Sequence, residues 1–586
     1  MIRNIIIICA AVLVCALPFA LRPAPDVGAW HEGDPVLVAV SPHIAAIRDE
    51  FANGFSHWHL KKYGTPVRID WRSIGGTTEI MRYLNGEYAA SYRAYRRRQG
   101  LDPGLANAAL SKNRPEDSEA AAAWDDFRAH DDPDAYGCKI DIFFGGGTYD
   151  HGSAERQGIT VAPWTAGNWP KGILEDDNGI EMIPRELGGE IWRTDVYVSA
   201  VLSGFGICSN PDRLRELGIE KMPSTWKDLT DPRLYGFVGV TDPTKSGSIA
   251  KAFEMILHAT CREHVLAAGW TPEQIQTFET AAKKGLQNDL PDFPRYQADV
   301  EAGWLSGIHL LQRVGANSRY FTDAAGKVPV DVSSGDAAAG ICIDFYGRVQ
   351  AETTRVGNQD RLNYVTPHGG STISGDPISL LRGAEHRELA QHFIEFVLCE
   401  DGQKLWNGRP GSDGGPQKHA LRRLPVRRDF YPDDQNPTVD ARARARKGTT
   451  SDDLLDPTVD AYTLANAFTY EPRWTAAHFS FLRSFVRAMC MDAGRELRSA
   501  WKAILEAGGP EAVPEAVALL ERMPVEPYPI DWATVTEASR NRSMTKGLSE
   551  TDLTSAWTSF FRNSYREAEA CARKLAAEQK KPASAP

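Results

Sequence analysis

Paired cysteines are the first feature that this sequence of 586 residues lacks. Two of its nine cysteines, Cys9 and Cys15, lie in an apolar N-terminal run, and the other seven are scattered without any CxxC pair. This spacing excludes a disulfide scaffold and a zinc cluster, while it allows one or two isolated disulfides.

An excess of positive charge is missing as well. The formal net charge is -11, whereas a domain that binds nucleic acid is usually basic. The local basic run YRAYRRRQG near Arg96 is typical of a solvated surface. Nucleic acid is therefore not an expected partner.

The common catalytic motifs do not occur either. There is no GxxxxGK[ST] loop, no HExxH and no GxSxG, and the GGG at 145–147 lacks the GxGxxG spacing. Carboxylates such as Asp141 and Asp242 follow apolar runs, but the sequence does not pair them as acid and base. We therefore expect no catalysis, with an exported phosphatase or other hydrolase as the alternative from another class.

Only the N-terminus carries a long apolar run. Arg3 precedes apolar residues from Ile5 to Ala20, and Pro23 and Pro25 follow. This pattern predicts a secretory signal peptide or an uncleaved N-terminal membrane anchor over residues 1–29. The remainder is expected in the periplasm, either free or tethered to the inner membrane.

What the chain does have is an alternation of strand and helix patterns. The order β-α-β-α is given by an apolar run at 35–41, an amphipathic stretch at 43–64, a second strand at 67–72 and a further helix. Thr77 or Thr78 is the expected N-cap of that further helix. This order predicts an α/β fold with doubly wound sheets. Residues 192–210 are expected to form two strand segments, separated at Ser203-Gly204, that cross between lobes.

Glycine- or hydroxyl-rich turns follow four of the apolar strands, at 41–43, 73–77, 144–148 and 244–248. In an open parallel sheet, ligands bind beyond the carboxyl ends of the strands. Helix N-terminal amides and Ser/Thr hydroxyls suit an anion there. The four turns together predict one anion site lined by several strand ends.

Three longer stretches carry a resemblance to a known family. They are STWKDLTDPRLYGFVGVTDPTKSGS (224–248), NSRYFTDAAGKVPVDVSSGDAAAGICIDFY (317–346) and VTPHGGSTISGDPISLLRGAEHRELAQHFIEFVLCEDGQKLW (365–406). In order and spacing, residues 35–430 resemble periplasmic solute-binding proteins of bacterial ABC transporters. Within these they are similar to the ferric-iron, phosphonate and sugar-phosphate branch of the type II (polyamine/iron-type) proteins.

The resemblance implies a two-lobed type II fold with a helical C-terminal extension. The expected parts are a signal or anchor (1–29), lobe 1 (30–195, with an insertion at about 92–137), lobe 2 (196–343), a return to lobe 1 (344–430) and a mostly helical region packing on the lobes (431–586).

The resemblance also implies where a solute is held. Ser246, Gly247, Ser248 and Asn317 are expected to hold an anionic group. Ser41, His43, Gly76, Thr77, Gly146, Gly147 and Thr148 are expected to approach it from the other lobe, and Asp344 and Tyr346 to contact the rest of the ligand.

The expected function is the capture of an organic phosphate, phosphonate or similar oxyanion by a monomer, for delivery to an ABC-type permease. A sensor input module would use the same site. No cofactor is expected, but Fe(III) with a synergistic anion is the alternative cargo, with His43 and Tyr346 as its ligands. Phe345 stands where ferric relatives carry a first tyrosine, and 145–148 lacks their glutamate. These departures favour the organic anion.

Overall fold

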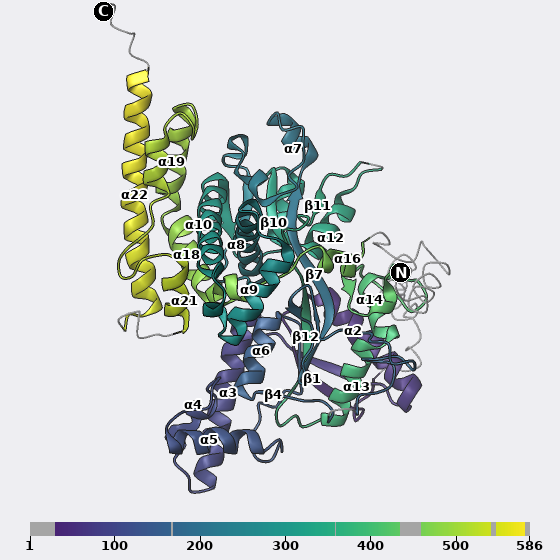
Figure 1. The fold of residues 1–586 in the computed structure, drawn as a ribbon. Coiled ribbons are helices and arrows are strands. Elements are labelled where there is room, and N and C mark those ends of the chain that lie inside the picture. Colours follow the sequence, from purple (N-terminus) through teal and green to yellow (C-terminus); the bar gives the residue numbers. More distant parts are fainter. Residues whose placement is uncertain (1–29, 166–167, 358, 434–458, 541–546, 580–586) are drawn as a thin grey trace, which may run out of the picture.

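The computed structural model describes residues 30–586 except 166–167, 358, 434–458, 541–546 and 580–586 (Figure 1). The expected signal or anchor at 1–29 lies outside the described residues. Within the described part, no helix is both long and apolar enough to cross a membrane.

The strands form a single path in the order β2-β1-β3-β12-β7-β10-β8-β9. Their bounds are β1 (Val36–Val40), β2 (Arg68–Arg72), β3 (Ile142–Phe144), β7 (Tyr197–Ser209), β8 (Val238–Thr241), β9 (Ser318–Thr322), β10 (Ala339–Ile343) and β12 (Ile373–Leu381). Short strands β4 (Thr160–Val161), β11 (Asn363–Val365) and β13 (Leu424–Pro425) pair at the sides, and β5 (Glu186–Leu187) and β6 (Glu190–Ile191) form a separate hairpin.

Strand β7 divides this path into two lobes. Residues 197–204 pair with β12 in what we call the N-terminal lobe, and residues 205–209 pair with β10 in the C-terminal lobe. The chain crosses between the lobes in β7 and again between β11 and β12. Strands β7 and β12, which we call the crossing strands, pair antiparallel. The pairs of β1 with β2 and β3, and of β8 with β9 and β10, are parallel. The expected break at Ser203-Gly204 is wrong, because β7 runs through these residues as one buried strand.

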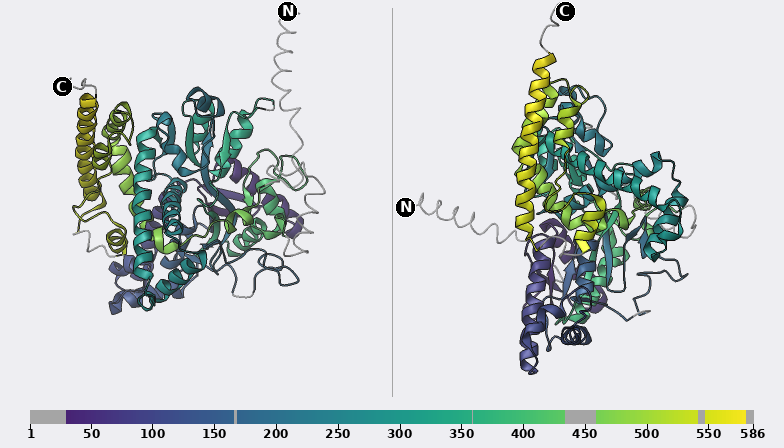
Figure 2. Two further views of the ribbon diagram at one scale, coloured as in Figure 1. Left: turned by 45° about the horizontal axis from the view of Figure 1, so that its top comes forward. Right: turned by 60° about the vertical axis from the view of Figure 1, so that its left-hand side comes forward.

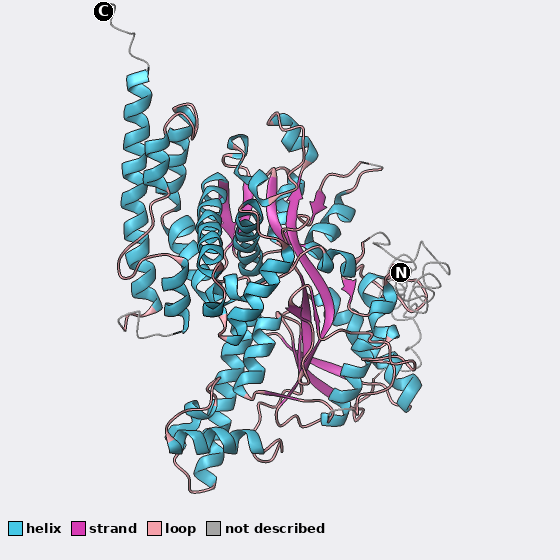
Figure 3. Ribbon diagram, viewed as in Figure 1, coloured by secondary structure: helices cyan, strands magenta, loops and turns pink. Residues whose placement is uncertain are grey.

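Helices cover both faces of each lobe's sheet (Figure 3). The N-terminal lobe carries α2 (Ala45–Tyr63), α3 (Thr77–Arg98), α4 (Ala106–Ala109), α5 (Ser118–Ala129), α6 (Thr148–Gln157), α13 (Arg387–Leu398) and α14 (Glu400–Asn407). The C-terminal lobe carries α7 (Pro211–Glu216), α8 (Gly247–Ala267), α9 (Pro272–Lys284), α10 (Phe293–Asn317), α11 (Lys327–Ser334) and α12 (Asp344–Thr354).

The chain after residue 458 forms the helical C-terminal extension. Its helices are α16 (Ala461–Asn466), α17 (Pro472–Thr475), α18 (Phe479–Val486), α19 (Gly494–Glu506), α20 (Pro514–Leu520), α21 (Trp532–Arg540) and α22 (Glu550–Gln579). Figure 2 shows α22 standing along the outer side of the C-terminal lobe. The predicted fold class, a two-lobed type II α/β fold with doubly wound sheets and a helical extension, is confirmed.

Separate hydrophobic cores support the lobes. The N-terminal lobe packs Phe51, Phe144 and Trp406 on one face and Tyr88 and Tyr92 on the other. The main core of the C-terminal lobe continues into the extension, where Trp474, Phe485 and Trp501 are buried against α8 and α10. Burial of several aromatic rings, each worth about 1.5–3 kcal/mol, makes the extension part of this core.

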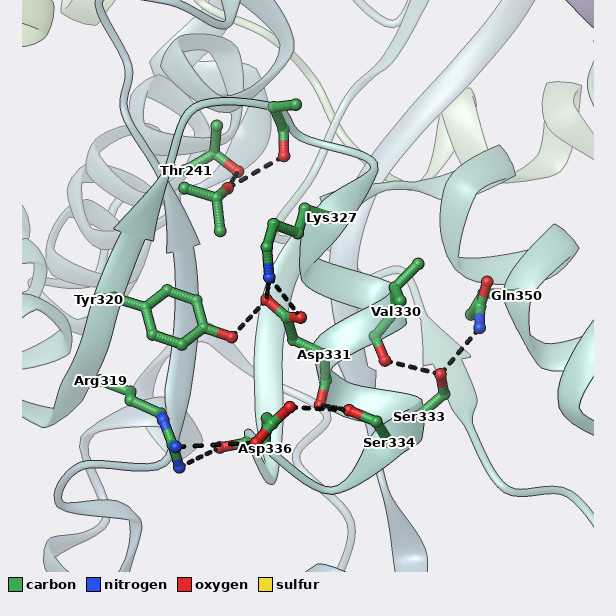
Figure 4. A network of polar contacts seen from close by, with 12 residues as sticks. Thr241, Arg319, Tyr320, Lys327, Val330, Asp331, Ser333, Ser334, Asp336 and Gln350 are labelled. Carbon is green, nitrogen blue, oxygen red and sulfur yellow. Dashed lines mark hydrogen bonds and ion pairs between the residues drawn. The ribbon is translucent and has the colours of Figure 1, made fainter.

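Polar contacts fix the outer helix of the C-terminal lobe. Asp331 of α11 accepts hydrogen bonds from the Tyr320 hydroxyl and from Lys327, at 2.6 Å for the lysine (Figure 4). The nearby Ser333 and Ser334 bond the backbone of their own helix. This network holds α11 on β9 and does not line the cavity between the lobes.

Candidate functional site

A cavity of about 730 Å³ lies between the two lobes and is lined by both. Ten of the residues predicted for the ligand site line it: His43, Gly76, Thr77, Gly146, Gly147, Thr148, Ser246, Gly247, Ser248 and Tyr346. The structure therefore brings together residues that are up to three hundred positions apart in the chain.

Three helix N-termini meet at this cavity. Helix α3 begins after Gly76, α6 after Gly147 and the 21-residue α8 after Ser246. The expectation that Thr77 or Thr78 caps α3 is wrong, because Gly76 is its N-cap. The first turns of helices carry unpaired N–H groups and the positive end of the helix dipole. The cavity is consequently suited to negative charge.

The serines of the 242–248 loop lie at the start of α8. Ser246 Oγ accepts from the Ile249 backbone N–H at 3.4 Å and lies 3.1 Å from Ser248 Oγ. Asp242 Oδ1 fixes the loop by accepting from the Thr244 backbone N–H at 2.8 Å. Both serines line the cavity, where their hydroxyls can donate hydrogen bonds to an acceptor on a ligand.

The glycines at 145–146 let two side chains approach closely. Gly145 has φ +90° and Gly146 has φ +106°, a region that favours glycine. A Cβ on Gly145 would lie 2.4 Å from the His43 ring, and one on Gly146 would lie 2.7 Å from Thr77 Cγ2. The glycine turn therefore holds His43 and Thr77 against the end of β3.

An arginine that the sequence analysis missed lies at the floor of the cavity. The side chain of Arg423 is fully buried and donates to Ser203 on β7 and to Asp376 on β12. Its Nη1 lies 3.3 Å from His43 Nε2, and its guanidinium is 4.6 Å from the Phe345 ring centroid. Arg423 thereby joins both crossing strands to residues from both lobes.

The pKa values of this group reflect burial and the arginine. Burial lowers the pKa of His43, and Arg423 adds to that effect against the opposing pull of Asp376. Burial alone would raise the pKa of Asp376, but Arg423 and His43 hold it below its usual value. His43 is therefore neutral and Asp376 ionised near pH 7. His43 Nδ1 is buried without a hydrogen-bond partner in the described part of the chain.

A second charged cluster lines another side of the cavity. Lys251 Nζ lies 2.8 Å from Glu190 and 3.2 Å from Glu254, and 4.0 Å from the centre of the Tyr470 ring. Burial alone would lower the pKa of Lys251, but the two carboxylates hold it well above its usual value. Tyr470 belongs to the C-terminal extension and donates its hydroxyl to Glu254.

Two more charged residues line the cavity from α6. Burial raises the pKa of Asp150 to about 6, against the opposing charges of Arg483 and Lys112. Arg156 lines the cavity without an ion pair among the described residues. The side chain of Asp150 thus titrates close to the N-terminal amides of α6.

Three predicted site residues do not line the cavity. Ser41 lies beneath it, where its hydroxyl accepts from the His43 backbone N–H at 3.1 Å. Asp344 is buried at the start of α12 and accepts from the Phe345 N–H at 2.8 Å.

Asn317 is placed elsewhere altogether. Its amide nitrogen donates to the carbonyls of Leu229 and Asp231 at 3.0 and 2.9 Å. Its oxygen accepts from Trp501 Nε1, 2.9 Å away, in the extension. The side chain of Asn317 therefore links the end of α10 to α19 through hydrogen bonds and does not face the cavity.

One of the missed residues had a weak sequence signal. Asp376 precedes Pro377 inside β12, where the register with β7 shifts. A proline within a strand usually marks a bulge, which redirects the neighbouring side chain. Arg423 had no such signal, because it is one of several arginines in a loop. No group of three or more His, Cys, Asp or Glu suited to a metal occurs in the described ranges.

The central region of the chain is similar to a known protein family. Residues 171–420 match the family described as bacterial extracellular solute-binding protein, which confirms the resemblance seen in the sequence. An uncharacterized protein of Haemophilus influenzae is 26% identical over 212 residues, which cover 36% of this chain and 47% of that protein. The chain thus spans about half the length of this relative.

Solved structures of periplasmic binding proteins are also similar. AfuA from Actinobacillus pleuropneumoniae, with fructose-6-phosphate bound, is 18% identical with a TM-score of 0.39, covering 63% of this chain and 81% of that one. Iron-bound HitA from Pseudomonas aeruginosa is 13% identical with a TM-score of 0.42, covering 77% and 99%.

Proposed function

We propose that this chain, whose residues 171–420 match the bacterial extracellular solute-binding family, captures an anionic solute in the cavity between its lobes. The solute class is an organic phosphate, a phosphonate or a similar oxyanion, bound without turnover. Delivery to an ABC-type permease at the outer face of the inner membrane, by a monomer, is part of the proposal.

The convergence of three helix N-termini on one cavity is the observation that carries the proposal. The amides of α3, α6 and α8 and the hydroxyls of Thr77, Thr148, Ser246 and Ser248 line it from both lobes. Such groups hold an oxyanion through directed hydrogen bonds and the positive ends of the helix dipoles. Arg156 adds a positive charge that no described carboxylate pairs.

The same site suits ferric iron less well. Fe(III) is a hard cation and prefers anionic oxygen ligands. Arg423 places a permanent positive charge 3.3 Å from His43 Nε2, one of the two ligands expected for iron. That nitrogen and the Asp376 carboxylate already bond the arginine. The arginine therefore disfavours a metal cation at His43.

The test is a titration of residues 30–586, freed of bound ligand by partial unfolding and refolding. Inorganic phosphate, sugar phosphates, a phosphonate and Fe(III) with and without phosphate are compared by calorimetry. Saturable binding of a phosphate or phosphonate without metal supports the proposal. Binding only with Fe(III) present overturns it in favour of the iron alternative, and release of a product overturns binding without turnover.

Paired serine variants locate the site. The double variant Ser246→Ala/Ser248→Ala should weaken binding by about tenfold or more, because two hydroxyl contacts to a charged ligand are lost. The matched control is Ser333→Ala/Ser334→Ala on α11, away from the cavity (Figure 4). Equal affinities of the two double variants would contradict an anion site at the start of α8.

A further inference from the structure

The C-terminal extension passes from one lobe to the other beside the cavity. Ala461 and Ala465 of α16 are buried in the core of the N-terminal lobe, and Trp474 and Phe485 in the core of the C-terminal lobe. Between them, the Tyr470 backbone N–H donates to the Gly188 carbonyl at 2.8 Å. The extension is therefore a further connection between the lobes, in addition to the crossing strands.

The β5–β6 turn packs directly against the backbone of the extension. Gly188 and Gly189 have φ of +58° and +79°, and a Cβ on Gly189 would lie 2.1 Å from the Tyr470 carbonyl oxygen. Only glycine lets the turn of the N-terminal lobe pack against the backbone of the extension in this way. This contact places the Tyr470 ring at the cavity, where its hydroxyl bonds Glu254 of the C-terminal lobe.

The extension also supplies part of the cavity wall. Tyr470, Pro472, Ala476, Ala477 and Phe479 line it. Phe479 packs on Tyr149 of α6 with ring centroids 5.0 Å apart, and Ser480 Oγ lies 3.4 Å from the Tyr149 hydroxyl. Two residues of the extension thus contact the N-terminal lobe at the start of α6.

Arg483 on α18 bonds both lobes at once. Its Nη2 donates to Thr78 Oγ1 of α3 at 2.9 Å and to the Thr244 carbonyl at 2.7 Å, and its Nε donates to the Pro243 carbonyl at 2.9 Å. Thr78 belongs to the N-terminal lobe, whereas Pro243 and Thr244 belong to the loop that carries Ser246. Arg483 therefore positions that loop against α3 without itself lining the cavity.

The lobes are in near contact at this point. A Cβ on Gly76 would lie 3.7 Å from the Lys245 carbonyl oxygen, across the boundary between the lobes. Helix α18 lies on the side of α8 away from β7, as Figure 1 shows. The crossing strands join the lobes on one side of α8, and the extension joins them on the other.

We propose that residues 470–483 of the extension act as a clasp: they complete the solute cavity and hold the lobes closed through Arg483, so that solute leaves only when the clasp opens. The identity of the solute as an anion rests on the proposed function, but the restraint on the lobes does not. Two-lobed binding proteins open by rotation about the crossing segments. The extension connects the lobes on the other side of α8 and restrains that rotation. Release of this connection then limits the rate at which solute exchanges.

The test compares Arg483→Ala with Arg487→Ala in residues 30–586. Arg487 contacts Asp242 and Thr244 of the C-terminal lobe at 3.5 and 3.3 Å, and in the described chain no contact joins it to the N-terminal lobe. Small-angle scattering without any added solute should give a larger radius of gyration for Arg483→Ala than for the unmodified chain, and no increase for Arg487→Ala. Thr78→Val should give the same increase, because it removes the hydrogen bond from the other lobe. Arg483→Lys, which keeps one donor, should give a smaller increase.

A second measurement gives the rate at which bound solute is released. With inorganic phosphate as the probe, Arg483→Ala should release it about tenfold faster than the unmodified chain, the effect of losing hydrogen bonds from a charged group. Equal radii of gyration for the unmodified chain and all four variants would overturn the clasp, whatever the probe does. If no chain binds phosphate but the radii differ as expected, the clasp stands and the anion proposal fails.

Discussion

His43 and Arg423 lie 380 residues apart in the chain, yet their side-chain nitrogens are 3.3 Å apart at the floor of the cavity. The arginine is held by Asp376 and Ser203, one on each crossing strand. The histidine is held by Ser41 and the glycine turn at 145–146. This pair links the place where the lobes are joined to the place where the solute is proposed to bind.

Arg423→Ala should destabilise the fold by about 3–5 kcal/mol, because it removes a fully buried guanidinium and leaves the partly buried Asp376 carboxylate without its arginine partner. Urea unfolding of both proteins measures the loss. The double variant Arg423→Met/Asp376→Leu should recover much of it, since it removes both charges together. A single variant that is as stable as the double would show that the pair is not coupled.

Sulfate should bind more tightly as the pH falls from about 7 to 5. The pKa of Asp150 is raised to about 6, so its carboxylate loses a negative charge at the cavity over this range. Sulfate is the probe because it does not itself titrate there. Calorimetric titrations of the unmodified chain and of Asp150→Asn measure the effect. The variant should bind sulfate more tightly at pH 7 and show a flatter profile, and parallel profiles would exclude Asp150 as the cause.

Protonation of Asp150 should also change the free energy of unfolding, and its raised pKa fixes the direction of that change. Its folded pKa lies above the usual value of 3.8, so the folded state takes up the proton first as the pH falls. Between about pH 4 and 6 the free energy of unfolding should therefore rise toward acid, relative to Asp150→Asn. Chemical denaturation of both chains at several pH values measures the difference. The opposite slope would contradict the raised pKa.

Gly145→Ala should be more destabilising than Gly172→Ala. Both glycines have positive φ, at +90° and +76°, which alone costs an alanine about 1–2 kcal/mol. Only at Gly145 does a Cβ meet another group, the His43 ring at 2.4 Å, whereas Gly172 has nothing within 4 Å. Thermal unfolding separates the two effects. Equal losses would mean that the ring moves away without penalty.

Asn317→Ala should lower stability and leave solute affinity unchanged. The variant removes three hydrogen bonds, to Leu229, Asp231 and Trp501, of which the one to Asp231 is partly buried and the other two are buried. The groups left unpaired account for a loss of about 1–3 kcal/mol. Phosphate affinity, measured well below the unfolding temperature, should match that of the unmodified chain. A large loss of affinity would restore the ligand role inferred from the family resemblance.

The sequence predicted the part of the site that depends on local pattern. Strand, turn and helix N-terminus follow one another within a few residues at 73–77, 144–148 and 244–248, so apolar runs and glycines were enough to find them. The carboxyl ends of the strands then meet by the topology of the sheet. Ten of the expected residues consequently line one cavity.

The rest of the site depends on contacts that no local pattern encodes. Arg423 reaches the cavity from a loop, and Tyr470 from the extension, each through packing against residues hundreds of positions away. The break at Ser203-Gly204 was expected because both residues are poor strand formers. Full burial and pairing with Ser374 and Ile373 of β12 override that preference. Asn317 was assigned by its place in a resembling motif, but its side chain faces the extension instead.

The wall that Tyr470 and Phe479 supply has a consequence for the order in which the protein matures. A chain is synthesised from its N-terminus, so the strands that join the lobes are available before these residues exist. The cavity stays open on one flank until residues 470–483 have been made and have packed beside the lobes. A closed cavity is thus among the last features that a newly made molecule acquires.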